Sequence, residues 1–241
     1  MPPDLRGKVA LVTGVGRVGQ IGHAVARGLG RAGAALVIAD LNATALAERA
    51  REFAAAGLAV EGSAGDLTTP EAARRAVATA GQRFGGLDLV VNVAGGLVNY
   101  GPVLELTPDQ FERELAINLK TTLFVSQAAI PKLRERGGGA IVNFASAAVV
   151  KPQSLMASYS AAKAAVAGLT RALARELRDD RIRVNAVAPG TMRTADNLAS
   201  MKDAKVRWVE LDDLVAAVLY LASDEARAVS GEILPVTGGD V

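Results

Sequence analysis

Residues 9–24 read VALVTGVGRVGQIGHA, a short apolar run that leads through a glycine-rich turn into a helix-like stretch. At such a turn, backbone N–H groups and the positive end of the helix dipole can approach a pyrophosphate, because no Cβ atom intervenes. No Gly-Lys-Ser/Thr sequence follows, so the turn is not a P-loop. We expect a dinucleotide-binding turn; a tight turn without a ligand is the alternative that the motif alone leaves open. The candidate contacts are Gly14, Gly16, Gly19, Ile21 and Gly22.

The same strand-then-helix rhythm continues along the chain. Short β-branched apolar runs occur at 9–12, 35–39, 58–60, 87–92, 140–144, 182–188 and 232–236. Helical periodicity is found at 22–33, 43–56, 69–84, 108–135, 157–178 and 211–223. Repeated units of this kind predict an α/β fold, a doubly wound parallel sheet of about seven strands with helices on both faces, or Rossmann fold. We expect a single domain over 1–241, because no linker interrupts the rhythm, with its least regular part at 191–210.

Two charged residues bear on the choice of dinucleotide. The second predicted strand ends at Asp40, about 20 residues beyond the glycine turn, where a carboxylate can accept hydrogen bonds from the adenosine ribose and repel a 2′-phosphate. Arg17 lies inside the turn and is the competing signal, because its guanidinium could reach such a phosphate. We favour NAD over NADP, on the expectation that Asp40 lies beside the 2′ position while Arg17 faces solvent.

The composition excludes several kinds of chemistry. The 241 residues include no Cys and one His, which excludes thiol nucleophiles, thiolate zinc sites and multi-histidine sites, so we expect no metal. That residue, His23, follows the last glycine of the turn and is read as an ordinary first-turn helix residue rather than a base. The net charge of +2 comes without basic blocks, so no nucleic-acid partner is expected. No signal peptide or membrane span is apparent, and we expect a cytoplasmic protein without membrane contact.

Further motifs appear in a fixed order along the chain. They are Asp66-Leu67, Asn92-Val93-Ala94-Gly95, Asn118, Ser146, Tyr159-Ser160-Ala161-Ala162-Lys163 and Pro189-Gly190. Together with the glycine turn, these motifs resemble the short-chain dehydrogenase/reductase family over nearly the whole chain. Ser146 stands 13 positions before Tyr159, the offset that the family uses, so the resemblance selects it over Ser154 and Ser158.

The resemblance implies a role for each matching residue. Asn118 would anchor a proton-relay water, and the reacting centre would comprise Ser146, Tyr159 and Lys163. Lys163 would also hold the nicotinamide ribose. Asp66 and Leu67 would frame the adenine. The remaining cofactor contacts implied by the family are Asn92, Ala94, Gly95, Pro189, Gly190 and Thr194.

The chemistry of the reacting centre follows from its residue types. Tyr159 and Lys163 are four positions apart and share one face of a helix. The ordinary pKa of a phenol is about 10, and a nearby ammonium, with the positive ring of an oxidised nicotinamide, would lower it. Tyr159 would then exchange a proton with the substrate oxygen, to which Ser146 would donate a hydrogen bond.

Two departures from the family pattern concern the two ends of the expected site. The glycine turn is longer than the usual form, with Gln20 where glycine is common, so the separate roles of Gly16 and Gly19 stay open. The segment 195–207 is short and polar where family members often carry a helical lid, which predicts a small or open substrate site. The expected walls are Leu97, Val98, Asn99, Tyr100, Val149, Val150, Met192, Leu198 and Trp208. The resemblance also implies a homotetramer packed through helices 108–135 and 157–178.

These observations lead to a hypothesis with rivals. We expect an NAD(P)(H)-dependent oxidoreductase that interconverts a secondary alcohol and a ketone by hydride transfer on a small-molecule substrate. Reduction of a 3-oxoacyl thioester is one option, and dehydrogenation of a small hydroxylated metabolite is another. A catalytically inactive nucleotide-binding regulator, or a methyltransferase with a similar glycine turn, would not need Asn118, Ser146, Tyr159 and Lys163 together.

Overall fold

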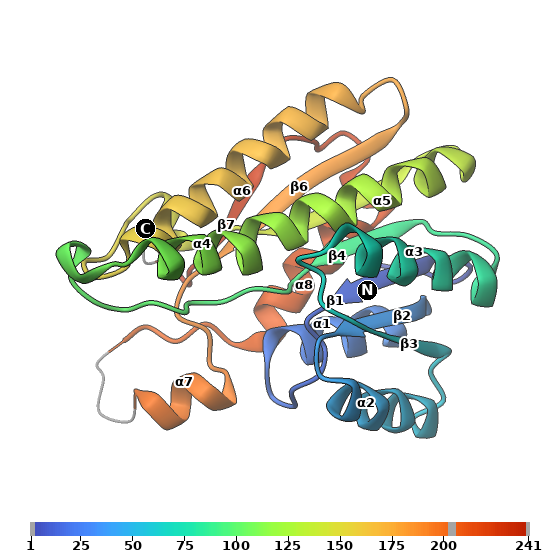
Figure 1. Ribbon diagram of the computed structural model, residues 1–241. Coiled ribbons are helices and arrows are strands. Elements are labelled where there is room, and N and C mark those ends of the chain that lie inside the picture. The colour runs from blue at the N-terminus through green and yellow to red at the C-terminus, as the bar shows by residue number, and fades with distance from the viewer. Residues whose placement is uncertain (1–2, 202–205, 240–241) are drawn as a thin grey trace.

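Seven parallel strands form one sheet in the order β3-β2-β1-β4-β5-β6-β7 (Figure 1). The computed structural model describes residues 3–201 and 206–239, so both ends of the expected domain and part of the 191–210 segment lie outside the described residues. The strands are β1 (Val9–Thr13), β2 (Ala35–Asp40), β3 (Val60–Ala64), β4 (Leu89–Asn92), β5 (Gly139–Phe144), β6 (Ile182–Pro189) and β7 (Ile233–Val236). The α-helices are α1 (Ile21–Arg31), α2 (Ala43–Ala55), α3 (Pro70–Phe84), α4 (Pro108–Leu115), α5 (Thr121–Glu135), α6 (Ala157–Glu176), α7 (Ala195–Ser200) and α8 (Leu211–Ala222). Short 3-10 turns occupy Val103–Glu105, Ala147–Val149 and Asp224–Ala226, and Ala116–Lys120 form a π-helical turn.

Helices cover both faces of the sheet. Buried apolar side chains of α1, α2 and α8 pack on one face, and those of α3, α5 and α6 pack on the other. All five residues of β1 are buried, as are all four of β4, because neither face of the central strands reaches solvent. The predicted doubly wound α/β architecture is therefore confirmed.

The chain reverses its direction across the sheet between β1 and β4. Ala10 of β1 lies opposite Leu36 of β2 on one side and opposite Leu89 of β4 on the other. From β3, at the sheet edge, the chain crosses back to the centre to form β4. In doubly wound sheets, ligands bind in the crevice outside the carboxyl ends of the strands at such a reversal. This edge is where the site is expected.

One sequence-based boundary was wrong, and two other segments contain structure that the sequence did not show. The third strand runs over Val60–Ala64 rather than 58–60, because it is a half-exposed edge strand whose Glu61-Gly62-Ser63 lacks an apolar pattern. Helix 108–135 is two α-helices joined by the π-helical turn, a local widening that apolar periodicity does not reveal. The 191–210 segment contains α7, and a parallel bridge between Met192 and Val209 brings its two ends together.

Candidate active site

The predicted site residues gather at one edge of the sheet. The glycine turn follows β1, Asp40 ends β2, Asn92 ends β4, Ser146 follows β5 and Pro189 ends β6. Lys163, in the second turn of α6, donates a hydrogen bond from Nζ to the carbonyl oxygen of Phe144, the last residue of β5 (2.8 Å). The fold thus brings the predicted cofactor residues and the predicted reacting residues to the same edge, at the carboxyl ends of the strands.

Helix α1 begins without the side-chain cap that α2, α3 and α4 have. Its N-cap residue, Gln20, accepts no hydrogen bond from the first turn, which also contains no acidic residue. In contrast, Asn42, Thr69 and Thr107 each accept a first-turn N–H at the starts of α2, α3 and α4. Uncapped N–H groups and the helix dipole attract anions, so the start of α1 fits the pyrophosphate of a dinucleotide.

The predicted glycines are required by close contacts within the chain. A Cβ atom at Gly22 would lie 2.0 Å from the Gly14 carbonyl oxygen, so α1 approaches the end of β1 only with glycine at this position. Gly14 has a φ of +74°, and a Cβ there would lie 3.0 Å from the Cα of Ala94. A Cβ at Gly16 would meet the Asp40 carboxylate, and one at Gly19 would meet Ala195. Gly16 and Gly19 thus make room for the end of β2 and the start of α7.

The two charged residues that bear on the dinucleotide have different partners. The Asp40 carboxylate accepts hydrogen bonds from the N–H groups of Gly16 (2.8 Å) and Asn42 (3.0 Å), which hold it against the glycine turn. Arg17 faces solvent as expected, and in addition it forms an ion pair with Asp196 of α7, in which both side chains remain largely exposed. The pair ties the glycine turn to α7, and Asp196 balances the positive charge that could attract a 2′-phosphate.

The residues expected at the adenine differ in exposure. Asp66 is exposed, and its Oδ1 accepts hydrogen bonds from the N–H (2.9 Å) and hydroxyl (2.7 Å) of Thr68. Leu67 is buried in the apolar core on the α3 side of the sheet. The turn after β3 therefore presents the Asp66 side chain, and Leu67 anchors the turn from beneath.

Asn92 belongs to a buried polar network under the site. Its Nδ2 donates to Ser126 Oγ (3.1 Å) and Asn143 Oδ1 (2.9 Å), and Asn143 in turn donates to Thr170 Oγ1 (3.0 Å). These bonds connect β4 with β5, α5 and α6. Farther along the same loop, the N–H of Ala94 donates to Thr13 Oγ1 (2.9 Å), and Gly95 has a φ of +140°. The network ties the end of β4 to the neighbouring strand and helices beneath the predicted cofactor contacts.

Pro189, Gly190 and Thr194 form the border between β6 and α7. The N–H of Gly190 donates to the Val236 carbonyl (3.0 Å), and a Cβ at Gly190 would lie 3.2 Å from the Cα of Thr237. The Thr194 hydroxyl accepts the N–H of Asn197 (3.2 Å) and so caps α7. These three residues fix where the segment that carries α7 leaves the sheet.

The structure brings Ser146 and Tyr159 together and places Lys163 beside them. The Ser146 hydroxyl lies close enough to Tyr159 to lower the pKa of that phenol, and it also accepts the N–H of Ala148 (3.2 Å). Lys163 Nζ lies 5.8 Å from the centre of the Tyr159 ring and is almost fully buried. Of the two alternative serines, Ser154 is exposed and Ser158 bonds to Glu114, which leaves Ser146 as the hydroxyl at the tyrosine.

Burial displaces the pKa values of both titratable groups. Burial lowers the pKa of Lys163 to about 8, against the opposing effect of the negative Glu114. The pKa of Tyr159 is raised above its ordinary value, chiefly by burial and further by Glu114, while the nearby Ser146 hydroxyl opposes the rise. The sequence argument expected Lys163 to lower the pKa of Tyr159, but within the chain itself burial outweighs any such effect.

Asn118 lies in the π-helical turn and is fully buried. Its side-chain amide exchanges two hydrogen bonds with the backbone of Gly96, accepting from the N–H (3.0 Å) and donating to the carbonyl (3.0 Å). A Cβ at Gly95 would lie 2.6 Å from Asn118 Oδ1. The amide therefore holds the loop after β4, and Thr122 Oγ1 donates to the Asn118 carbonyl (2.9 Å).

Sequence reasoning missed Glu114, one helical turn before Asn118. Its side chain is fully buried, although α4 has four exposed polar or charged residues and an apolar pattern too sparse to single out an inward carboxylate. The only available signal was its spacing of four residues from Asn118, which places both on one helix face.

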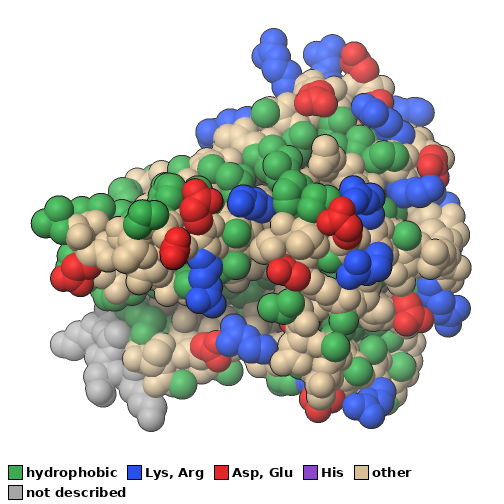
Figure 2. Space-filling model, viewed as in Figure 1, with side chains coloured by type: hydrophobic (Ala, Val, Ile, Leu, Met, Phe, Trp, Pro, Cys, Tyr) green, Lys and Arg blue, Asp and Glu red, His purple; other side chains and the backbone are tan. Residues whose placement is uncertain are grey.

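The expected substrate walls divide into two groups. Met192 is buried and Val149 and Trp208 are partly buried, whereas Leu97, Val98, Tyr100, Val150 and Leu198 are exposed. Figure 2 shows the molecular surface hollowed between the layer that carries α4 and the segment that carries α7, with hydrophobic side chains along the upper rim. Exposed apolar residues on loops around such a hollow are typical of a ligand-binding mouth.

His23 and metal binding lie outside the candidate chemistry. His23 is buried in the first turn of α1, stacks on Phe53 and contacts Glu52 through Nε2 (2.9 Å), so it packs α1 against α2.

In residues 3–201 and 206–239, no group of three or more His, Cys, Asp or Glu side chains is arranged to hold a metal ion. Within the same residues, no helix is both long and apolar enough to cross a membrane.

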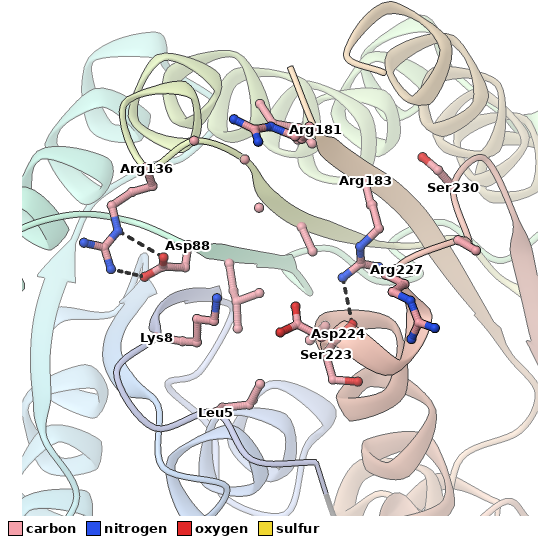
Figure 3. Close-up of a pocket in the computed structure, with 18 of the residues that line it drawn as sticks. Leu5, Lys8, Asp88, Arg136, Arg181, Arg183, Ser223, Asp224, Arg227 and Ser230 are labelled. Carbon is pink, nitrogen blue, oxygen red and sulfur yellow. Dashed lines mark hydrogen bonds and ion pairs between the residues drawn. The ribbon is translucent and has the colours of Figure 1, made fainter. Parts of the chain in front are cut away.

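A second cavity, of about 660 Å³, lies at the opposite end of the sheet (Figure 3). It is lined by charged residues from the amino ends of the strands, and many of these charges are satisfied internally. Arg136 is bonded twice to Asp88 (3.0 and 3.1 Å), and Arg183 donates to the carbonyls of Leu221 (2.7 Å) and Ser223 (3.0 Å). This cavity shares no residue with the candidate active site.

Comparison with known proteins agrees with the geometry. Residues 8–205 match the protein family described as short chain dehydrogenase. The chain is 38% identical to 4-formylbenzenesulfonate dehydrogenase TsaC1/TsaC2 of Comamonas testosteroni, over 98% of each protein. It is 33% identical to a gluconate 5-dehydrogenase of Burkholderia cenocepacia J2315 in complex with NADP and tartrate (TM-score 0.91, covering 98% of this chain and 96% of that one). A 7α-hydroxysteroid dehydrogenase in complex with NADH and 7-oxo glycochenodeoxycholic acid is 32% identical (TM-score 0.91, 99% and 96% covered). The chain therefore belongs to the short-chain dehydrogenase/reductase family and is an NAD(P)-dependent oxidoreductase that acts on hydroxyl or keto groups.

Proposed function

We propose that this enzyme interconverts a secondary alcohol and a ketone with NAD(H), using Tyr159 as the proton-transfer group. The observation that carries the proposal is the position of Lys163 Nζ, 5.8 Å from the centre of the Tyr159 ring, with the Ser146 hydroxyl beside that tyrosine at the same edge as the glycine turn. The nicotinamide supplies the hydride acceptor or donor. The chain supplies a phenol that takes or gives a proton at the substrate oxygen, and a serine hydroxyl that stabilises charge on that oxygen.

Lys163 has two tasks in this proposal. Its Nζ is held by the Phe144 carbonyl, which fixes the ammonium beside Tyr159. A positive charge there favours the tyrosinate, in opposition to the burial that raises the pKa of Tyr159. We also assign Lys163 to the nicotinamide ribose and Asn118 to the proton relay.

The preference for NAD rests on Asp40. Its carboxylate lies against the Gly16 N–H, beside the turn proposed to hold the pyrophosphate, where it would repel a 2′-phosphate. Arg17 is already paired with Asp196 and is less available to attract that phosphate. The related gluconate dehydrogenase is in complex with NADP and the hydroxysteroid dehydrogenase with NADH, so the family accommodates both.

The proposed substrate is a 3-oxoacyl thioester, reduced at its ketone. The exposed apolar side chains of Leu97, Val98, Val150 and Leu198 support it, because they offer an apolar wall for an acyl chain. A small hydroxylated metabolite, oxidised to its ketone, is the second candidate. It is supported by the gluconate and hydroxysteroid dehydrogenases among the related structures.

A paired screen tests both candidates. Purified enzyme is mixed with NADH or NADPH and a series of 3-oxoacyl thioesters of increasing chain length, and with NAD or NADP and a series of hydroxy acids and sugar alcohols. Absorbance of the reduced nicotinamide reports turnover. We expect the rate of NADH-dependent reduction of the thioesters to exceed the rate of oxidation of the hydroxy acids and sugar alcohols. Turnover only in the second series would replace the thioester with a hydroxylated metabolite, and nucleotide binding without turnover in either would favour a regulator.

We further propose that the enzyme is a homotetramer that packs through α5 and α6. Both helices pack on the same face of the sheet, and Leu123 of α5 is exposed (Figure 1). Light scattering after size-exclusion chromatography is expected to give four times the chain mass of 24.8 kDa. A monomeric mass would refute this assignment.

A further inference from the structure

Glu114 is a fully buried carboxylate in the last turn of α4. In the part of the chain that the structure describes, no Lys or Arg forms an ion pair with it. Burying an ionised carboxylate is unfavourable unless hydrogen bonds replace its hydration. The groups that bind the Glu114 carboxylate must therefore replace the water that it loses on burial.

Hydrogen-bond donors from three separate segments converge on the Glu114 carboxylate. The loop after β4 contributes the N–H of Val98 (3.2 Å), the N–H of Asn99 (2.9 Å) and the Asn99 side-chain amide (3.1 Å). The π-helical turn contributes the side-chain amide of Asn118 (3.2 Å). The start of α6 contributes the hydroxyl of Ser158 (3.4 Å), the residue before Tyr159. An acceptor-only group with two oxygens suits this set, because every neighbour donates.

Each of the three segments belongs to a different part of the candidate active site. The loop after β4 carries Leu97, Val98 and Tyr100 of the expected substrate wall, the π-helical turn carries Asn118, and the start of α6 carries Tyr159. Asn118 in turn holds the backbone of Gly96. One carboxylate therefore sets the distance between the substrate wall, the relay residue and the helix that presents the proton-transfer group.

We propose that Glu114 is a positioning residue for the alcohol–ketone chemistry, fixing the 97–99 loop, the Asn118 amide and the start of α6 relative to one another. This inference rests on the proposed function of Tyr159 and Lys163. Glu114 does not touch the reacting atoms; it acts through the segments that do.

The charge of Glu114 adds a second, measurable consequence. Of the titratable groups on the elements packed around it, Tyr159 and Lys163 on α6 face Glu114. The charged residues of its own helix and of the π-helical turn are exposed, as is Tyr100 on the loop; they are Asp109, Glu112, Arg113 and Lys120. The negative charge raises the pKa of both Tyr159 and Lys163, so its removal lowers both. The pH profile of the reaction should therefore move to lower pH when the charge is removed.

The test uses three variants and a control in the full-length enzyme. Glu114→Gln keeps the size of the side chain but turns one oxygen into a donor that faces other donors. Glu114→Asp keeps the charge on a shorter stem. Asn99→Ala removes one donor from the loop and leaves the core intact. Glu112→Gln is the matched control, because this acid is on the same helix and exposed.

Kinetics are measured with the alcohol–ketone pair that the wild-type enzyme turns over, from pH 6 to 10, with NADH binding and thermal unfolding in parallel. We expect Glu114→Gln to lower kcat/KM at least tenfold and to shift the pH profile to lower pH, with NADH affinity within twofold of wild type. Glu114→Asp should recover part of the rate and retain the wild-type pH profile. Asn99→Ala should raise KM for the substrate two- to fivefold at unchanged kcat, and Glu112→Gln should match wild type.

Several results would overturn the inference. A folded Glu114→Gln enzyme with wild-type kcat, KM and pH profile would do so directly. If Glu114→Gln does not fold, Glu114→Asp and Asn99→Ala decide, and wild-type kinetics in both would refute the role. If the wild-type enzyme turns over no alcohol or ketone, the proposed function fails instead, and that outcome is recognised before any variant is compared.

Discussion

The two ends of the candidate site differ in the groups that form them, backbone groups at one end and buried side chains at the other. The cofactor end, which comprises the glycine turn 14–22 and Asp40, presents backbone N–H groups, glycines without room for a Cβ and charges that are exposed or half-exposed. The reaction end, which comprises Ser146, Tyr159, Lys163 and Glu114, presents buried or half-buried side chains, and the pKa values of Tyr159 and Lys163 are displaced from their ordinary values. Substitutions that add atoms should therefore be most harmful at the cofactor end. Substitutions that remove a proton-transfer group or a charge should be most harmful at the reaction end.

Removing the Tyr159 hydroxyl is expected to have the largest effect. Tyr159→Phe should lower kcat/KM by about 10²–10⁴-fold, the usual contribution of a general acid–base, while NADH affinity changes by less than about twofold. The measurement is initial rate by absorbance together with fluorescence titration of NADH. Tyr220→Phe, in a partly exposed position on α8, is the control. Full turnover by Tyr159→Phe would show that another group transfers the proton.

The pH dependence of stability should reveal Lys163. Its pKa is about 8 in the folded chain and 10.5 as a free side chain, so the unfolded chain binds more protons between these values and folding is favoured as pH rises through them. This difference between the folded and free pKa values corresponds to about 3 kcal/mol in the free energy of unfolding. The free energy of unfolding is measured by chemical denaturation at pH 7 and at pH 10. It should rise between these pH values by most of this amount more in the wild-type protein than in Lys163→Met. Lys132→Met, at a partly exposed position, should show no such difference; equal pH dependence in all three proteins would contradict the prediction.

A single methyl group tests the cofactor end. Gly22→Ala places a Cβ 2.0 Å from a backbone oxygen that cannot move aside cheaply, so the free energy of unfolding should fall by about 1–3 kcal/mol and NADH affinity should fall with it. Gly81→Ala, in α3 with no atom within 4 Å of the new Cβ, should be neutral or stabilising. Calorimetry and NADH titration measure both variants. Equal behaviour of the two would mean that the contact between α1 and the end of β1 is not required.

The smallest expected effect concerns the choice of dinucleotide. Asp40→Asn preserves an acceptor for the Gly16 N–H but removes the charge, and should improve NADPH affinity relative to NADH by about tenfold, or about 1.4 kcal/mol. Arg17→Ala should change the ratio less, because Arg17 is already paired with Asp196. Fluorescence titration with both dinucleotides gives the ratio. A native enzyme that prefers NADPH would refute the assignment of Asp40.

The sequence predicted the parts of the fold and of the site that repeat or that follow a motif. The alternation of apolar strands and helices led to the parallel sheet, and the motif order led to Ser146, Tyr159 and Lys163, which the structure places together. The prediction was wrong at the edge strand β3, where one-sided burial weakens the apolar pattern, and it did not reveal the π-helical turn inside the helical stretch 108–135. It also did not reveal the ion-pair partner of Arg17, which is 179 residues away along the chain.

Local sequence alone determined what depends on near neighbours: the glycine turn, the four-residue spacing of Tyr159 and Lys163, and the absence of any cysteine chemistry. Tertiary structure decided what depends on burial and on distant segments. It brought Ser146 next to Tyr159, lowered the pKa of Lys163 to about 8 and surrounded Glu114 with donors from three segments. The physical reason is that desolvation and hydrogen-bond satisfaction are properties of a packed environment, which no stretch of sequence contains by itself.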